Sequence, residues 1–113
     1  MTPIPEPPDF RLEVRSEVTQ TVVAAVGELD LAGVGDFGAV LRERLEAGPV
    51  LLDLSELTFM DSSGVRALDA VLGEARRERR AFAVRRAMHD NVRQVLEMTA
   101  LYDALPFEAD PAT

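Results

Sequence analysis

The chain has 113 residues, no cysteine and a formal net charge of −8. This length predicts one domain that buries a core without disulfides, and the lack of cysteine excludes thiolate metal sites and fits a reducing cytoplasm. The negative charge argues against nucleic-acid and anionic-membrane partners, and no apolar segment approaches the roughly 20 residues that span a bilayer.

The N-terminal part of the sequence predicts a lead-in followed by a hairpin. Residues 1–9 are rich in proline and have no basic residue, so we expect a disordered lead-in and no signal peptide. Residues 10–15 alternate apolar and charged side chains, as a half-exposed strand does, and residues 21–26 form a denser apolar run that suits a central strand. The polar residues 17–20 fit the turn between them.

Apolar residues at helical spacing predict three helices, at residues 31–47, 65–80 and 90–99. Glycines in the first half of the first helix lower helix propensity by up to about 1 kcal/mol each, so this helix should begin late. Further apolar runs predict strands at 50–54 and 81–84, with a short edge pairing at 105–107 before a flexible tail at 109–113.

The element order β-β-α-β-α-β-α predicts an α/β domain over residues 10–108, with helices packed on a mixed sheet of four to five strands. Its parallel strands require right-handed crossovers. In such sheets, functional loops lie beyond the carboxyl ends of the parallel strands. The loops at Gly27–Asp30 and Leu57–Ser63 should therefore be neighbours in space.

The segment Phe59-Met60-Asp61-Ser62-Ser63-Gly64-Val65 joins a predicted strand to a predicted helix. Two hydroxyls and a carboxylate therefore lie where backbone N–H groups point outward. A serine at such a place is a helix cap, a nucleophile or a phosphate acceptor. The residues alone favour a cap. Asp61 weakens that interpretation, because an aspartate can cap the helix alone and leave both serines spare.

Three other groups of polar residues allow a function but favour a plainer interpretation. Asp30 and Asp61 can hold a metal or act as acid and base, although two solvated loop carboxylates are the simpler interpretation. His89 can form a hydrolase triad with Ser62 and an aspartate, but the sequence lacks a Gly-x-Ser-x-Gly elbow, so a helix-start residue fits better. A basic cluster, for which a solvated face is the default, comprises Arg76, Arg77, Arg79, Arg80, Arg85 and Arg86.

Three segments together carry a resemblance to a known family. They are Gly27-Glu28-Leu29-Asp30, then Leu52-Asp53-Leu54-Ser55 followed by Phe59-Met60-Asp61-Ser62-Ser63-Gly64, and finally residues 92–101. With these segments at matching spacing, residues 10–108 resemble the anti-sigma-factor antagonists, small single-domain members of the STAS family in bacteria. The Asp-Ser-Ser-Gly tetrad is weak evidence alone and gains its weight from its position.

The resemblance implies a regulatory binding protein without enzymatic activity, cofactor or metal, which acts in a partner switch of transcription such as a stress response. The unphosphorylated antagonist would bind an anti-sigma factor, which then releases its sigma factor. That anti-sigma factor is also a serine kinase, and it ends the interaction by phosphorylating the serine after the aspartate. A metal-dependent serine phosphatase resets the switch.

In this sequence the resemblance makes Ser62 the acceptor, with Ser63 as runner-up and with Asp61 orienting the Ser62 hydroxyl. We expect a cytoplasmic monomer or weak dimer that binds neither nucleic acid nor membrane. The alternative is a STAS scaffold, or a subunit of a larger regulatory assembly, that is never phosphorylated. The predicted partner-binding face comprises Glu28, Asp30, Met60, Asp61, Ser63, Gly64, Val65 and Arg66.

One departure from the family pattern concerns the phosphate site directly. Gly64-Val65-Arg66 stands where the family often has Gly-Leu-Gly, and an arginine there can pair with a phosphate or change which kinase docks. Whatever the arginine does, a phosphate adds about −1.5 to −2 charge beside Asp61, and we expect this charge to repel the partner. Free N–H groups and the helix dipole favour a phosphate at a helix start, so we expect the fold to remain intact.

Overall fold

Five strands form one mixed sheet in the computed structural model, which describes residues 10–109. β1, β2, β3 and β5 lie side by side in that order, and β4 pairs with β2 off this path. The predicted hairpin of β1 and β2 is antiparallel, and the other pairings are parallel. The expectations for residues 1–9 and 110–113 lie outside the described residues. The strands are β1 Phe10–Ser16, β2 Thr21–Leu29, β3 Val50–Asp53, β4 Leu57–Met60 and β5 Phe82–Val84.

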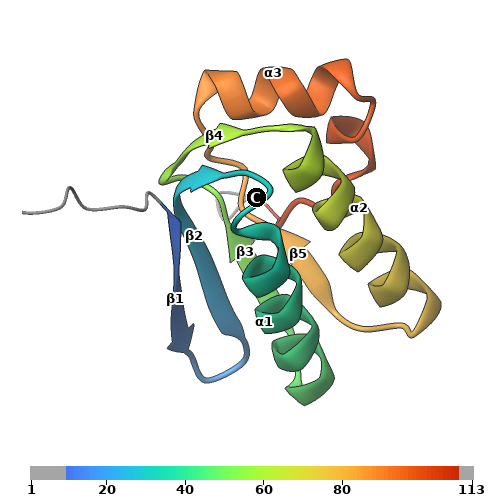
Figure 1. Ribbon diagram of the computed structural model, residues 1–113. Coiled ribbons are helices and arrows are strands. Elements are labelled where there is room, and N and C mark those ends of the chain that lie inside the picture. Colours follow the sequence, from blue (N-terminus) through green and yellow to red (C-terminus); the bar gives the residue numbers. More distant parts are fainter. Residues whose placement is uncertain (1–9, 110–113) are drawn as a thin grey trace, which may run out of the picture.

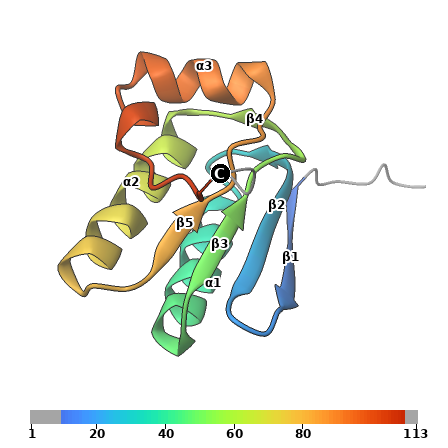
Figure 2. The same ribbon diagram turned by 180° about the vertical axis from the view of Figure 1, so that it is seen from behind.

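Helices α1 (Val34–Ala47) and α2 (Ser62–Arg77) cover one face of this sheet, and α3 (Asp90–Met98) lies across its end beside β4 (Figure 1, Figure 2). Their buried faces and the facing strands form one apolar core. α1 begins late, as predicted. α2 begins at Ser62, three residues before the predicted start at 65, because Asp61 caps it, and it ends at Arg77 instead of Arg80. Within residues 10–109, no helix is long and apolar enough to cross a membrane.

The prediction of a loop at 57–63 is wrong for its first four residues, because Leu57–Met60 form the strand β4. β4 pairs with the last part of β2, whereas β3 pairs with the first part, so β2 continues past its predicted end at residue 26. The change of partner takes place at Gly27, whose φ of 99° is a left-handed conformation that favours glycine. A register shift there leaves Thr58 of β4 without an opposite residue in β2, as in a β-bulge.

The register of β2 and β4 places the start of α2 beside the start of α1. Leu29 lies opposite Met60, so both strands end at the same edge of the sheet. From this edge one strand leads into α1 and the other into α2 (Figure 1). The predicted edge pairing at 105–107 is present as a single parallel bridge between Val84 and Phe107.

Candidate functional site

The carboxylate of Asp61 caps the N-terminus of α2. Its Oδ1 atom accepts hydrogen bonds from the backbone N–H groups of Ser63 (3.0 Å) and Gly64 (3.1 Å) and from the Ser63 hydroxyl (2.6 Å). The backbone of Asp61 is extended, so the chain passes from strand to helix within one residue. One side chain therefore satisfies two of the N–H groups that a helix start leaves without partners.

The same contacts lower the pKa of the Asp61 carboxyl. The Ser63 hydroxyl is the largest cause, and the N–H groups of Gly64 and Ser63 add to it, while desolvation acts in the opposite direction. The positive end of the helix dipole also favours an ionised carboxylate here. The start of α2 therefore carries a negative charge at neutral pH.

Ser62 is the first residue of α2, and it is exposed. The expectation that Asp61 orients the Ser62 hydroxyl is wrong, because the hydroxyl that Asp61 binds belongs to Ser63. None of the side-chain hydrogen bonds within residues 10–109 involves the Ser62 hydroxyl. Ser62 is thus neither the helix cap nor a buried residue, and its hydroxyl is open to solvent.

Asp30 and Asp61 line a shallow hollow between the start of α1 and the start of α2, together with Leu31 and Ala32. The Asp61 N–H donates to the carbonyl oxygen of Leu29 at 3.2 Å, which confirms that the two predicted loops are neighbours. The Asp30 carboxylate accepts a hydrogen bond from the Ala32 N–H at 3.0 Å. In the described part of the chain, no group of three or more His, Cys, Asp or Glu side chains could hold a metal. Each carboxylate therefore accepts hydrogen bonds from backbone N–H groups that follow it closely in the chain.

Two exposed apolar side chains were not predicted, one on the wall of this hollow and one in β4. Leu31 is 75% exposed, and Phe59, which lies opposite Glu28 in the β2–β4 register, is 43% exposed. Sequence reasoning missed Phe59 because two exposed residues stand between two buried ones in β4, so the alternation of a regular strand is absent. Leu31 falls within the predicted helix at 31–47 but outside its buried apolar face, and that position was the signal for its exposure. The signal was obscured because α1 begins only at Val34, so Leu31 lies in the turn before the helix.

Three residues of the predicted partner-binding face are buried and cannot contact a partner directly. Met60 is 1% exposed, Val65 is 8% exposed, and Gly64 is also buried. A Cβ atom on Gly64 would lie 2.8 Å from the Met60 Cγ and 3.2 Å from the Leu29 side chain. Only glycine therefore lets α2 approach the strands this closely. These residues fix the position of Ser62 from beneath.

Comparison with known proteins gives the family. A family model described as "Mlab, STAS domain" matches residues 12–106 of the 113. The chain belongs to the STAS domain family. A search of the curated proteins found no match.

Solved structures similar to this STAS domain include anti-sigma-factor antagonists. One from Mycobacterium paratuberculosis is 22% identical, and the match covers 96% of this chain and 93% of that chain with a TM-score of 0.78. The phosphorylated form of the Bacillus cell fate determinant SpoIIAA is 22% identical, with 91% and 93% coverage and a TM-score of 0.63. The STAS domain of an antisigma-factor antagonist from Rhodobacter sphaeroides is 29% identical, with 67% and 85% coverage and a TM-score of 0.54. These likenesses confirm the predicted α/β fold.

The remaining charged candidates of this STAS domain have plain structural positions. His89 is the exposed residue before α3, where a helix-start residue was expected, and its side chain makes no cap hydrogen bond. Two arginines of the predicted basic cluster form separate ion pairs, and Arg76 donates to the carbonyl oxygen of Ala104. Arg85 donates to Asp53 at 2.9 Å, and Arg80 lies 3.5 Å from Glu78.

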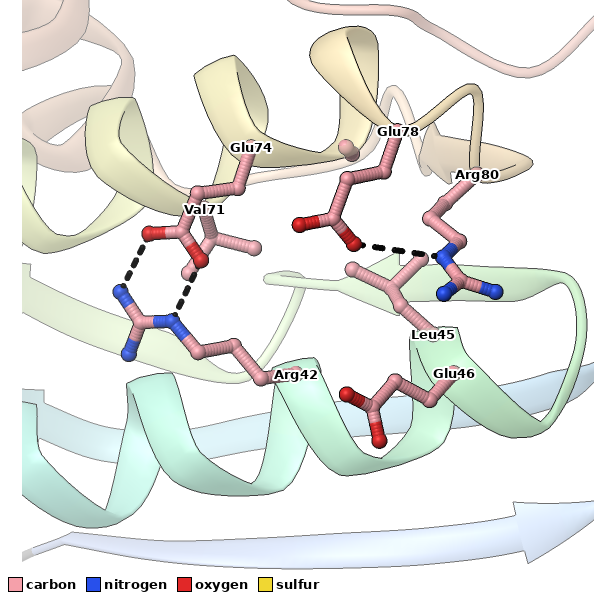
Figure 3. Close-up of a pocket in the computed structure, with 8 residues that line it drawn as sticks. Arg42, Leu45, Glu46, Val71, Glu74, Glu78 and Arg80 are labelled. Carbon is pink, nitrogen blue, oxygen red and sulfur yellow. Dashed lines mark hydrogen bonds and ion pairs between the residues drawn. The ribbon is translucent and has the colours of Figure 1, made fainter.

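A second pocket lies between α1 and α2, at the end of α2 that is remote from Ser62 (Figure 3). There the guanidinium of Arg42 donates to both carboxylate oxygens of Glu74, at 2.7 and 2.9 Å. The pocket is small, about 70 Å³, and Glu78 and Arg80 on its wall form another ion pair. The Arg42–Glu74 pair thus connects the two helices, and the geometry around Ser62 remains the stronger candidate for function.

Proposed function

We propose that this STAS domain is an anti-sigma-factor antagonist. In its unphosphorylated form it binds an anti-sigma factor that is also a serine kinase, and the sigma factor is released. Phosphorylation of Ser62 ends the interaction, and a metal-dependent serine phosphatase restores it. Three solved structures of the same fold carry the name of such antagonists or of a phosphorylated regulator, which supports the assignment.

The position of the Ser62 hydroxyl is the observation that carries this proposal. Asp61 caps α2 and the Ser63 hydroxyl donates to the same carboxylate, so Ser62 takes no part in the cap. Ser62 is exposed on the first turn of α2, and the opposite side of this turn, at Gly64 and Val65, is buried. A kinase can therefore reach the Ser62 hydroxyl without unfolding the domain.

The surface around Ser62 combines apolar contact area with negative charge. The exposed side chains of Leu31 and Phe59 offer apolar contact area, while Glu28, Asp30 and Asp61 add negative charge. Exposed apolar side chains with charged neighbours are common at protein–protein interfaces. The partner-binding face that we propose therefore comprises Glu28, Asp30, Leu31, Phe59, Asp61, Ser63 and Arg66, supported from beneath by Met60, Gly64 and Val65.

A phosphate on Ser62 acts on the interface and spares the fold. Asp61 retains the cap, and an anion near a helix start is favoured by about 0.3–1 kcal/mol at an exposed position. At the interface, however, a dianion joins a surface that is already acidic and that the partner must desolvate. Such uncompensated charge costs several kcal/mol of binding, and ~1.4 kcal/mol is a tenfold loss of affinity.

The partner and the acceptor can be identified in two steps. Ser62→Ala and Ser62→Asp proteins serve as baits in lysates of the native host, and the protein that prefers the Ala bait is sequenced and purified. It is then incubated with ATP and with the wild-type, Ser62→Ala and Ser63→Ala proteins. We expect label on the wild type and on Ser63→Ala, and none on Ser62→Ala. Full labelling of Ser62→Ala refutes the acceptor.

The same preparation tests the scaffold alternative. A chain that stays unlabelled and elutes from size-exclusion chromatography as a large homo-oligomer favours a STAS scaffold. A monomer or weak dimer that is labelled at Ser62 favours the switch.

A further inference from the structure

Arg66 lies one helical turn after Ser62, and both side chains are exposed on α2. Residues four apart on a helix are neighbours on its surface. Side chains also lean toward the helix N-terminus, so an arginine at the later position reaches back over the earlier one. None of the ion pairs within residues 10–109 involves Arg66, so its guanidinium is available.

The backbone at the start of α2 offers little to a phosphate. The N–H groups of Ser63 and Gly64 already donate to the Asp61 carboxylate, and the Val65 N–H donates to the Asp61 carbonyl oxygen. The sequence expectation that free N–H groups would receive the phosphate is therefore wrong for the N–H groups of Ser63 and Gly64. Apart from the Ser62 N–H itself, a phosphate on Ser62 needs another donor, or it must displace the cap.

Arg66 is the cation in an otherwise acidic neighbourhood. On the first two turns of α2 the other charged residues are Asp61 and Asp69, and the facing end of β2 with its loop contributes Glu28 and Asp30. A guanidinium binds phosphate oxygens through two parallel N–H groups, which suits a dianion better than a point charge does.

We propose that Arg66 holds the phosphate on Ser62, so that phosphorylation changes two groups of the docking face at once. This inference rests on the proposed function, since it requires Ser62 to be the acceptor. In the unphosphorylated protein Arg66 is free to contact the partner. In the phosphorylated protein its charge is engaged by the phosphate. The switch therefore adds a dianion to the partner-binding face and withdraws a cation from it.

The test places phosphoserine at position 62 by genetic encoding, which needs no kinase. The phosphate is titrated by ³¹P NMR between pH 4 and 8 in the full chain, in Arg66→Gln, in Arg66→Lys and in Arg77→Gln. Arg77 is an exposed arginine in the last turn of α2, so its variant makes the same change in net charge far from Ser62. We expect Arg66→Gln to raise the second phosphate pKa by about 0.3 unit or more, Arg77→Gln to leave it within about 0.1 unit, and Arg66→Lys to fall between them.

Equal midpoints in Arg66→Gln and Arg77→Gln would overturn the inference. A second readout is the Arg66 Nε–H resonance, which should shift when the phosphate is present and ionised; an unchanged resonance also counts against the contact. Because the phosphoserine is installed without a kinase, these failures leave the proposed function standing. If the kinase fails to label Ser62, the proposed function is refuted, while the NMR result on the Arg66–phosphate contact still holds.

Discussion

Helices α1 and α2 both begin where a parallel strand ends, yet their first turns are built differently. α2 follows β4 after one residue, and the Asp61 side chain caps it. α1 follows β2 only after a turn at residues 30–33, and its N-cap Gly33 makes no side-chain cap bond. The two starts lie side by side around one shallow hollow. One start is thus fixed in position, while the other is a loop that carries the exposed Leu31.

The difference indicates how the two halves of the proposed face work. A serine on a capped helix, with a glycine packed on the strands beneath it, is held in one place for a kinase. The turn before α1 is held by its own hydrogen bonds and presents an exposed leucine to a partner. Four substitutions, each with a control, test this contrast between a capped helix start and a turn that carries an exposed leucine.

The largest effect on stability is expected from Gly64→Ala. Its new Cβ would lie 2.8 Å from the Met60 Cγ and 3.2 Å from the Leu29 side chain, so the packing between α2 and the strands must shift. Such overpacking costs about 1–3 kcal/mol of unfolding free energy, measured by urea denaturation. The matched control is Gly35→Ala near the start of α1, where no atom lies within 4 Å of the added Cβ. There we expect a small gain of about 0.5 kcal/mol from helix propensity. Equal losses at both positions would contradict the contrast.

The next largest effect concerns the cap itself. Asp61→Ala leaves the N–H groups of Ser63 and Gly64 without their acceptor and should lower the unfolding free energy by about 1 kcal/mol. Asp61→Asn keeps an acceptor oxygen and should lose less than half as much. Asp30→Ala, which removes a single bond to the Ala32 N–H in the turn before α1, should also lose less. The comparison breaks if Asp30→Ala proves the more costly change.

A smaller effect appears in acid. The Ser63 hydroxyl is the largest cause of the lowered pKa of Asp61, so Ser63→Ala should raise that pKa toward its ordinary value, whereas Ser62→Ala should leave it unchanged. Carboxyl ¹³C NMR of Asp61 measures both variants. A carboxyl whose pKa is lowered on folding stabilises the fold above its unfolded value near 3.9, and the contribution is lost as pH falls through the folded value. Acid should therefore destabilise Ser63→Ala by less than the wild type, by a fraction of ~1 kcal/mol.

The smallest effect on stability is expected from Leu31→Ser. The side chain is 75% exposed, so the unfolding free energy should change by less than about 0.5 kcal/mol. Affinity for the anti-sigma factor should nevertheless fall, since the apolar contact is lost. Val18→Ser, at the remote hairpin turn and fully exposed, is the control that should change neither quantity. A Leu31→Ser protein that binds like the control would remove this loop from the docking face.

The sequence predicted the parts of this molecule that follow regular patterns. The hairpin, the periodic faces of the helices and the proximity of the two strand ends were all visible in it, and so was the ability of Asp61 to cap α2 alone. β4 was not, because a bulge at Thr58 and the turn of β2 at Gly27 break the period of two. The burial of Met60 and Gly64 was also hidden, since it depends on how closely α2 approaches two strands that are distant in sequence. Local patterns therefore placed Ser62 at the start of α2, while long-range packing decides which neighbours a partner can touch.

The most direct measurement compares the affinity of the purified anti-sigma kinase for the unmodified protein and for the protein with phosphoserine at position 62, by isothermal titration calorimetry without ATP. Our account predicts a loss of at least about tenfold, with the fold of the domain unchanged by NMR. Affinities within twofold of each other, for two well-folded proteins, would contradict a switch that acts through charge at Ser62.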